Sequence, residues 1–275
     1  MKTKQLFKFS AGIVVPCYNE EERLQLSEFS RFFKTDNTTF FCFVDDGSTD
    51  STKKIVADFV KKNPERAQAV FLSFNQGKAE AVRQGIKSLL KTHKLKFVGY
   101  WDADLATPLS TILEFIEKFQ SSRALVAVCG SRILRLGADI RRSVFRHYFG
   151  RVFATVVSNI LNIPVYDTQC GAKLFRTEHA GLIFSEHFIS RWFFDVELFA
   201  RSIELMGREK TVNSIYEMPL SKWHDQGESK VTWGSIIRTP VDLFRIFYHY
   251  RHRITNSSQS DTLQVKSPLL VKQID

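Results

Sequence analysis

Residues 97–104 read Phe-Val-Gly-Tyr-Trp-Asp-Ala-Asp, and this stretch decides the fold class. The uncharged run 97–101 is typical of a strand that a parallel sheet buries on both faces. Asp102 ends the run, and Asp104 follows two residues later. Two carboxylates at that spacing suit a shared divalent cation, because hard cations prefer oxygen ligands. The same pattern also occurs in solvated turns.

The segments around 97–104 alternate between short apolar runs and helical patterns. The predicted strands are 12–16, 40–44, 68–73, 97–101 and 125–129. The predicted helices between them are 20–33, 51–62, 79–91 and 110–120. This alternation predicts an α/β fold with a mostly parallel sheet and helices on both faces. After residue 130 we expect helices at 141–161, 191–205 and 234–250, and a strand at 212–218.

Polar motifs follow the predicted strands, at the edge where parallel sheets bind ligands. They are PCYNE at 16–20, DDGS at 45–48, NQGK at 75–78 and GSR at 130–132. An acid such as Asp45 accepts hydrogen bonds from a base or a ribose. A lysine at a helix start, such as Lys78, suits a bound anion, and Arg132 suits phosphate. Each motif alone also fits an ordinary turn, but together they predict one crevice.

Charge is unevenly distributed over the 275 residues, whose formal net charge is +10. Residues 132–151 carry six arginines and one aspartate, and residues 230–253 carry five basic residues and one aspartate. Such an excess indicates an anionic partner, such as nucleic acid, a membrane surface or a phosphorylated substrate. The four cysteines are scattered and form no CxxC pair, which predicts reduced, buried thiols instead of a zinc site or a disulfide framework.

In this order and spacing the motifs resemble those of family 2 glycosyltransferases of GT-A fold. The resembling segments are VPxYNE at 15–20, VDDGSTD at 44–50, NxGK at 75–78, DAD at 102–104 and GSR at 130–132. The match covers about residues 11–232, and no single motif is specific without the others. The resemblance implies a Rossmann-like fold and an inverting, metal-dependent enzyme that uses a nucleotide sugar.

The second half of the chain resembles one branch of that family, the dolichyl-phosphate (polyprenyl-phosphate) glucosyltransferases, with mannosyltransferases as near neighbours. The motifs are DTQCGAKLF at 167–175, RWxFDVEL at 191–198 and WHxxGxSKV at 223–231. This resemblance implies UDP-glucose as the favoured donor, a polyprenyl or dolichyl phosphate as acceptor, and Mg²⁺ or Mn²⁺ as cofactor. It also implies that a lipid-phosphate sugar is the product.

The resemblance also implies residue roles. The expected donor-binding residues are Pro16, Tyr18, Glu20, Asp45, Lys78, Asp102, Ala103, Asp104 and Lys230. The expected metal ligands are Asp102 and Asp104. The expected catalytic residues are Asp104, Arg132, Asp167 and Gln169, and the expected acceptor-binding residues are Arg132, Arg141, Arg142 and Asp195. Two positions depart from the family pattern, since Ala106 replaces a metal-binding glutamine and Ala79 replaces a glycine.

The two basic segments also carry many apolar side chains. Helices 141–161 and 234–250 mix arginines with aromatic and branched residues, a pattern typical of helices at a membrane interface. The alternative is that their apolar faces pack on the sheet. We expect a catalytic domain at 1–232, a membrane-interface helix at 233–254 and a flexible tail at 255–275. No segment is apolar enough to span a bilayer, and peripheral attachment to the cytoplasmic face of a membrane follows as the expected location.

Several alternatives remain open on the sequence. The donor is GDP-mannose in the neighbouring branch, and a soluble acceptor would replace the lipid in other enzymes of this fold. A separate membrane protein is a possible partner. We expect no nucleic-acid binding, because the acidic crevice would repel a phosphate backbone and no nucleic-acid motif is present. An inactive lipid-binding scaffold is disfavoured by the intact acidic motifs.

Overall fold

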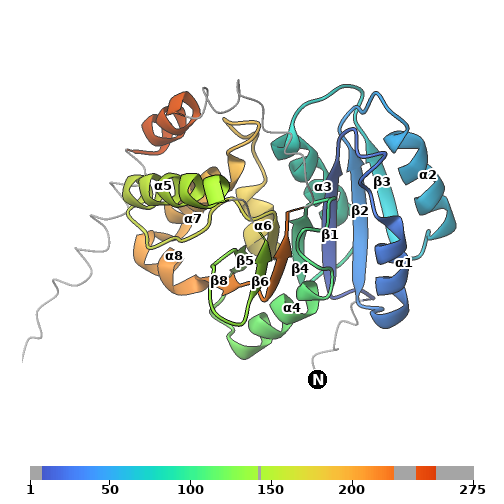
Figure 1. The fold of residues 1–275 in the computed structure, drawn as a ribbon, viewed down its shortest axis with the longest axis horizontal. Coiled ribbons are helices and arrows are strands. Elements are labelled where there is room, and N and C mark those ends of the chain that lie inside the picture. The colour runs from blue at the N-terminus through green and yellow to red at the C-terminus, as the bar shows by residue number, and fades with distance from the viewer. Residues whose placement is uncertain (1–7, 142–143, 226–239, 252–275) are drawn as a thin grey trace, which may run out of the picture.

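A central sheet of seven strands organises the protein (Figure 1). The structure is a computed structural model that describes residues 8–141, 144–225 and 240–251. The strands are β1 (Ala11–Cys17), β2 (Thr39–Asp45), β3 (Ala67–Phe71), β4 (Phe97–Trp101), β5 (Ala127–Ser131), β7 (Ala172–Arg176) and β8 (Ile215–Pro219). Their order is β3-β2-β1-β4-β7-β5-β8, and only β7 runs antiparallel to its neighbours.

Helices cover both faces of the sheet. One face packs against α1 (Leu26–Thr35), α2 (Thr52–Lys62) and α4 (Thr111–Ser121). The other face packs against α3 (Lys78–Thr92), α5 (Val144–Leu161), α6 (Thr177–Ile183) and α7 (Phe194–Met206). Helix α8 (Arg208–Ser214) leads into β8, and the short strands β6 (Asp139–Arg141) and β9 (Lys222–His224) pair in parallel beside the main sheet.

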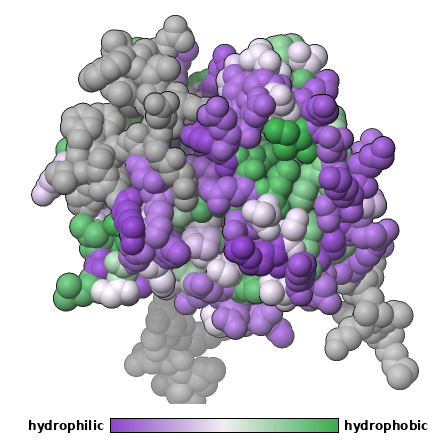
Figure 2. Space-filling view, turned by 45° about the vertical axis from the view of Figure 1, so that its right-hand side comes forward, coloured by the Kyte–Doolittle hydropathy of each residue, from purple (hydrophilic) through white to green (hydrophobic). Residues whose placement is uncertain are grey.

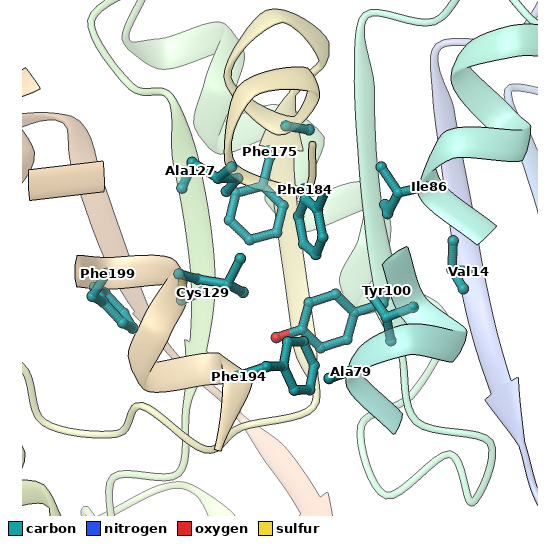
Figure 3. Packing of buried hydrophobic residues seen from close by; sticks show 14 of the residues in the cluster. Val14, Ala79, Ile86, Tyr100, Ala127, Cys129, Phe175, Phe184, Phe194 and Phe199 are labelled. Carbon is teal, nitrogen blue, oxygen red and sulfur yellow. The ribbon is translucent and has the colours of Figure 1, made fainter. Parts of the chain in front are cut away.

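The alternation of side chains along β2 shows why the sheet needs both helical layers. Phe41 and Phe43 belong to the apolar cluster on the α1 side, whereas Phe40, Cys42 and Val44 belong to the cluster on the α3 side. Successive side chains of a strand point to opposite faces, so a continuous apolar strand requires cover on both. Figure 3 shows the α3-side cluster, in which aromatic rings fill the space between strands and helices.

The structure confirms the mostly parallel α/β fold and shifts several element boundaries. Arg141, expected to start a helix, lies in β6, and α5 begins at Val144. The first helix begins at Leu26 and not at residue 20, because the segment before it is tied to the loop after β2. The backbone N–H of Glu20 donates to Thr52 Oγ1 over 2.7 Å, and Asn19 has a φ of 50°. The strand expected at 212–218 is a helix up to Ser214, and β8 begins at Ile215.

The two basic helices each have a buried apolar face and an exposed apolar face. In α5, Ala154, Val157 and Leu161 are buried, while Tyr148, Val152 and Val156 are exposed. The described part of the second helix, 240–251, begins at Pro240 and is drawn in red in Figure 1. It buries Leu243, Ile246 and Tyr250 and exposes Val241, Phe244 and Tyr248. We call these six exposed side chains the apolar stripes.

Exposed hydrophobic side chains also occur outside the stripes, among them Phe74, Leu134 and Leu136. On the face drawn in Figure 2, hydrophilic residues predominate, and hydrophobic residues form a strip between them. No helix within the described ranges is both long enough and apolar enough to cross a bilayer. The expected boundary near 232 and the expected tail at 255–275 lie outside the described residues, so the division into domains stays a prediction.

Candidate active site

The neighbouring strands β4 and β7 bring the DAD motif and the DTQCG segment together. Asp102 follows β4, and Gly171 precedes β7, whose antiparallel course places its start at the carboxyl end of β4. The Asp102 N–H donates to the Gly171 carbonyl oxygen over 2.9 Å. A Cβ on residue 171 would lie 1.8 Å from Asp102 Oδ2, so only glycine fits beside this carboxylate. Segments about 70 residues apart in the sequence thus form one site.

A small pocket opens at this junction. It is lined by Asp102, Asp104, Ala106, Thr107, Arg132, Gly171 and Trp223. Asp104 Oδ1 accepts a hydrogen bond from the Ala106 N–H over 3.0 Å, and Ala103 between the two acids is buried. Burial and the nearby charge of Asp102 both raise the pKa of Asp104. The charge of Asp102 therefore destabilises the ionised form of Asp104, and a cation beside the pair would relieve this repulsion.

This donor set fits a divalent cation that takes its remaining ligands from elsewhere. Asp102 and Asp104 face the same pocket, and both offer the oxygen ligands that Mg²⁺ and Mn²⁺ prefer. Within the described ranges, no group of three or more His, Cys, Asp or Glu side chains is arranged to hold a metal. Two protein ligands suffice when phosphate oxygens and water complete the coordination shell. Ala106, at the position of the family's glutamine, supplies no ligating side chain.

Lys78 and Arg132, which we expected at phosphates, both pair with carboxylates. Lys78 Nζ lies 2.5 Å from Asp102 Oδ1. Arg132 binds Asp167 through two side-chain N–H groups at 2.7 and 2.8 Å, and its guanidinium lies 5.3 Å from the Trp223 ring centre. Burial alone raises the pKa of Asp167, but the charge and hydrogen bonds of Arg132 outweigh it and hold that pKa below its usual range.

The expected nucleoside residues lie at the carboxyl ends of β1 and β2. Asp45 is opposite Cys17 in the β1–β2 register and is 1% exposed. Neither Asp45 carboxylate oxygen has a hydrogen-bond partner among the described residues. A buried carboxylate without a partner is costly, so this one is prepared for a ligand that donates hydrogen bonds. Pro16 and Tyr18 are half-buried nearby on the chain, and Glu20 pairs with Arg23 at 2.8 Å.

The NQGK segment is held from two sides by residues to which sequence reasoning gave no role. Asp46 accepts hydrogen bonds from the Gln76 and Gly77 N–H groups over 2.7 and 2.8 Å. Arg191, before α7, donates to the Gln76 carbonyl over 2.9 Å and to both oxygens of Asn75 over 2.8 and 2.6 Å. Gly77, with φ of 98°, has no room for a Cβ against Arg191. These contacts fix the start of α3, where Lys78 lies.

Asp195, expected at the acceptor, lies in the interior and not along the acidic pocket. Its carboxylate accepts short hydrogen bonds from Lys173 Nζ and from the Tyr100 hydroxyl, and all three side chains are buried. Figure 3 shows the Tyr100 hydroxyl oxygen directed to Phe194, which neighbours Asp195 at the start of α7. Lys173 also donates to the Thr168 and Cys170 carbonyls over 2.9 and 2.8 Å. This buried network holds the 167–171 segment in place from the interior of the protein.

The other predicted site residues are dispersed. Gln169 lies in the same segment as Asp167, and its buried Nε2 has no hydrogen-bond partner in the described part of the chain. Arg141 is exposed on β6 and pairs with Asp139 at 3.0 Å. His224, in the WHxxGxSKV motif, also contacts Asp139, at 2.5 Å. Arg142 and Lys230 lie outside the described residues.

Sequence reasoning assigned no role to Asp46, Lys173, Arg191 and Trp223. Lys173 and Arg191 lie within motifs quoted for the family resemblance, and Trp223 begins another. The partner of Lys173 is 22 residues away in the sequence, and the partner of Arg191 is more than 100 residues away. A single sequence carries no signal for such pairings. Asp46 stands beside Asp45 in DDGS, and this spacing does not tell which acid faces the ligand.

The fold and the acidic crevice define the class of protein. The model of glycosyl transferase family 2 matches residues 12–183. The sheet and its helices resemble those of glucosyl-3-phosphoglycerate synthase from Mycobacterium tuberculosis in complex with UDP, a GT-A glycosyltransferase. The TM-score is 0.62, with 16% identity over 88% of this chain and 80% of the other. The chain therefore has the GT-A fold and belongs to glycosyl transferase family 2.

Relatives of higher identity share one name. Dolichyl-phosphate beta-glucosyltransferase of Dictyostelium discoideum is 32% identical over 256 residues, which are 87% of this chain and 74% of the relative. The Mus musculus protein of that name is 35% identical over 266 residues, 90% of this chain and 76% of the relative. The Saccharomyces cerevisiae protein is 33% identical over 80% of this chain and 68% of its own length. This chain is thus a transferase of their branch.

Proposed function

We propose that this enzyme transfers glucose from UDP-glucose to dolichyl or another polyprenyl phosphate, with inversion at the anomeric carbon. The observation that carries the proposal is the junction at which Asp102 and Asp104 meet the 167–171 segment in one pocket. It is supported by relatives that share this name over most of the chain. Neighbours of the same fold contain UDP with Mn²⁺ or Mg²⁺ in their solved structures.

The donor is held by three parts of the crevice. The unpartnered Asp45 carboxylate accepts the N–H of the uracil base, with Pro16, Tyr18 and Glu20 beside it on the loop after β1. Asp102 and Asp104 hold a divalent cation, which supplies positive charge to the leaving diphosphate. Lys78, fixed at the start of α3 by the contacts of the 75–77 segment, is within reach of the same diphosphate. Lys230, outside the described residues, is expected to close over it.

The acceptor phosphate supplies its own nucleophile. A phosphate monoester carries about −1.5 to −2 charges at neutral pH, so its oxygen attacks without a general base. That oxygen forms a bond to the anomeric carbon of glucose while the bond to the UDP oxygen breaks, and UDP leaves from the opposite face. The protein must therefore position two anions against their mutual repulsion. Arg132, held by Asp167 and lying over Trp223, offers a fixed guanidinium in this pocket.

The apolar stripes suit an acceptor that resides in a membrane. Their six side chains expose hydrophobic surface on two helices that also carry arginines, among them Arg151 and Arg245. Interfacial helices combine apolar contact with attraction to anionic lipids. On this proposal the enzyme attaches peripherally to the cytoplasmic face of a membrane. Each helix also buries an apolar face. The alternative interpretation, in which the apolar faces of these helices pack on the sheet, therefore applies to that buried face only.

A transfer assay tests the proposal. The full chain is incubated with Mn²⁺ or Mg²⁺, a short polyprenyl phosphate and radiolabelled UDP-glucose, with GDP-mannose in a parallel reaction. We expect label in the organic phase from UDP-glucose only. Label in the organic phase from GDP-mannose alone would show that the donor is GDP-mannose and that the acceptor is the lipid phosphate. Label transferred only to a soluble acceptor such as phosphoglycerate, or no transfer to any acceptor, would overturn the proposed acceptor.

A further inference from the structure

A cation, the ammonium group of Lys78, contacts one of the two acids of the pocket. Its Nζ lies 2.5 Å from Asp102 Oδ1, and the two side chains are 21% and 36% exposed. Lys78 is the first residue of α3, where the helix dipole disfavours positive charge. Its position is therefore stabilised by the carboxylates that it faces and not by the helix that carries it.

Several carboxylates act on this lysine together. Lys78 Nζ pairs directly with Asp102, and the charges of Asp195 and Asp104 attract the same ammonium group. Asp104 lies two residues from Asp102 and lines the same pocket. In the absence of substrate, Lys78 offsets part of the negative charge of this pair.

The ammonium group and a metal ion would share one carboxylate. Lys78 Nζ lies 2.5 Å from Asp102 Oδ1. A magnesium ion binds carboxylate oxygen at about 2.0–2.1 Å. A metal on either oxygen of Asp102 would therefore lie close to this ammonium group, and the two cations would repel each other.

We propose that Lys78 is a built-in substitute for the divalent cation: it occupies Asp102 in the free enzyme and moves to the donor diphosphate when the metal binds. The inference rests on the proposed function for its metal and its donor. Lys78 then has two successive anionic partners, Asp102 before donor binding and a phosphate afterwards. The fixed 75–77 segment keeps the base of the side chain in place, so only the lysine side chain needs to turn.

This exchange couples metal binding to donor binding. A metal that arrives alone must displace Lys78 and leave its ammonium group without a partner, so its affinity is low. A metal that arrives with the diphosphate provides Lys78 with a new partner, so its affinity rises. Linkage requires that the metal raise the affinity for UDP by the same factor. Lys78 therefore favours loading of metal and nucleotide together and disfavours an enzyme that holds metal alone.

The test is a Mn²⁺ titration of the full chain without nucleotide, in which free Mn²⁺ is measured by electron paramagnetic resonance. We expect Lys78→Met to bind Mn²⁺ with a Kd about tenfold lower than the wild-type enzyme, because a competing charge a few ångströms away is removed. With saturating UDP the advantage should disappear. The ratio of the Kd values without and with UDP should then be smaller in the variant.

Lys54→Met is the matched control, because it removes the same charge from an exposed position on α2. It should leave the Kd for Mn²⁺ unchanged. Unchanged or weaker Mn²⁺ binding by Lys78→Met, or an equal gain in both variants, would overturn the proposal. Lys78→Gln replaces Lys78→Met if the latter does not fold by circular dichroism. The titration contains no acceptor, so failure of the proposed lipid transfer would show in the transfer assay and not here.

Discussion

The part of the chain before residue 132, called here the donor side, and the part after it, the proposed acceptor side, differ in where they place apolar side chains. Among the described residues, three of the fifteen exposed large hydrophobic side chains lie before residue 132, and twelve lie after it. The first part places polar groups at strand ends and buries its apolar residues between helices and sheet. The second part buries one face of α5 and of helix 240–251 and exposes another. The first part of the chain therefore places most of its apolar side chains within the fold, whereas the stripes present surface for something outside it.

The largest expected effect tests the donor side. Asp104→Ala removes one of the two carboxylates of the pocket and should lower the rate of transfer more than about 100-fold, since electrostatic stabilisation at the reacting centre is lost. The fold should remain, because Asp104 makes only a local hydrogen bond to the backbone of Ala106. The rate of label transfer and the circular dichroism spectrum check both statements.

Asp58→Ala is the control for this prediction, because Asp58 is exposed on α2. It should keep the wild-type rate. Full activity in Asp104→Ala would remove the metal role from the DAD motif, and the donor side would then have to be defined by other residues.

The second prediction concerns stability at the junction of the two sides. Asp167→Asn leaves Arg132 buried without its ion-pair partner and should lower the free energy of unfolding by about 3–5 kcal/mol. Urea unfolding at pH 7 measures this loss. Arg31→Ala, which breaks an exposed pair with Glu28, should change the same quantity by less than about 1 kcal/mol.

The same pair predicts a dependence on pH. The pKa of Asp167 is held below its usual range, so its stabilising effect is fully present above the pKa of an unfolded aspartate, about 4. It is lost as the pH falls below that value toward the lowered pKa, because the unfolded state takes up the proton first. Asp167→Asn should therefore weaken the decline of stability in acid. An acid decline as steep as that of the wild-type protein would contradict this assignment.

A third, smaller effect tests the contact between the two sides. Arg191→Ala removes the hydrogen bonds to Asn75 and Gln76 and should raise the KM for the donor about tenfold, as expected for losing charged hydrogen bonds worth 1.5–3 kcal/mol. The KM for the lipid acceptor should not change. Added guanidinium should partly restore the donor KM, which a general loss of folding would not allow. An equal change in both KM values would show that the contact serves the whole fold.

The smallest expected effect concerns the apolar stripes. Val152→Glu on α5 places a negative charge on the stripe and should weaken binding to anionic vesicles about fivefold, equivalent to about 1 kcal/mol for one charge near the surface. Binding of UDP should be unaffected. Leu182→Glu, at an exposed position on α6 outside the stripes, is the control. Equal vesicle binding by all three proteins would remove the distinction between the two sides.

The sequence predicted well what depends on neighbouring residues. Asp45 and Asp102 were placed at strand ends because uncharged runs of five residues precede them, and the structure puts them there. The predicted strand at 212–218 starts too early because Val212 favours a strand, yet Val212 continues the short helix that begins after Gly207, whose φ is 81°. Packing against α7 and β8 outweighed propensity at this point.

Ion pairs and hydrogen bonds between residues far apart in the chain could not be predicted from the sequence. Lys78 and Arg132 were assigned to phosphates from their residue type, and the structure pairs each with a carboxylate that another motif supplies. The acceptor role expected for Asp195 stays a prediction, and the structure shows its carboxylate held in the interior by Lys173 and Tyr100. Periodicity reports which face of an element is apolar, and it carries no information on which polar group lies opposite.

The antiparallel strand β7 has a consequence for the order in which the protein is made. Strands β1, β2, β3 and β4 emerge from the ribosome within the first 101 residues, and among them β1 pairs with β2 and β4, and β2 pairs with β3. The edge of β4 at Phe97–Trp101 stays open until residues 172–176 have been synthesised. An unpaired, apolar strand edge is a template for association between chains. Strand β4, which leads into the DAD motif, is therefore open to association with other chains during synthesis, and a chain that stops before residue 172 would keep that edge open permanently.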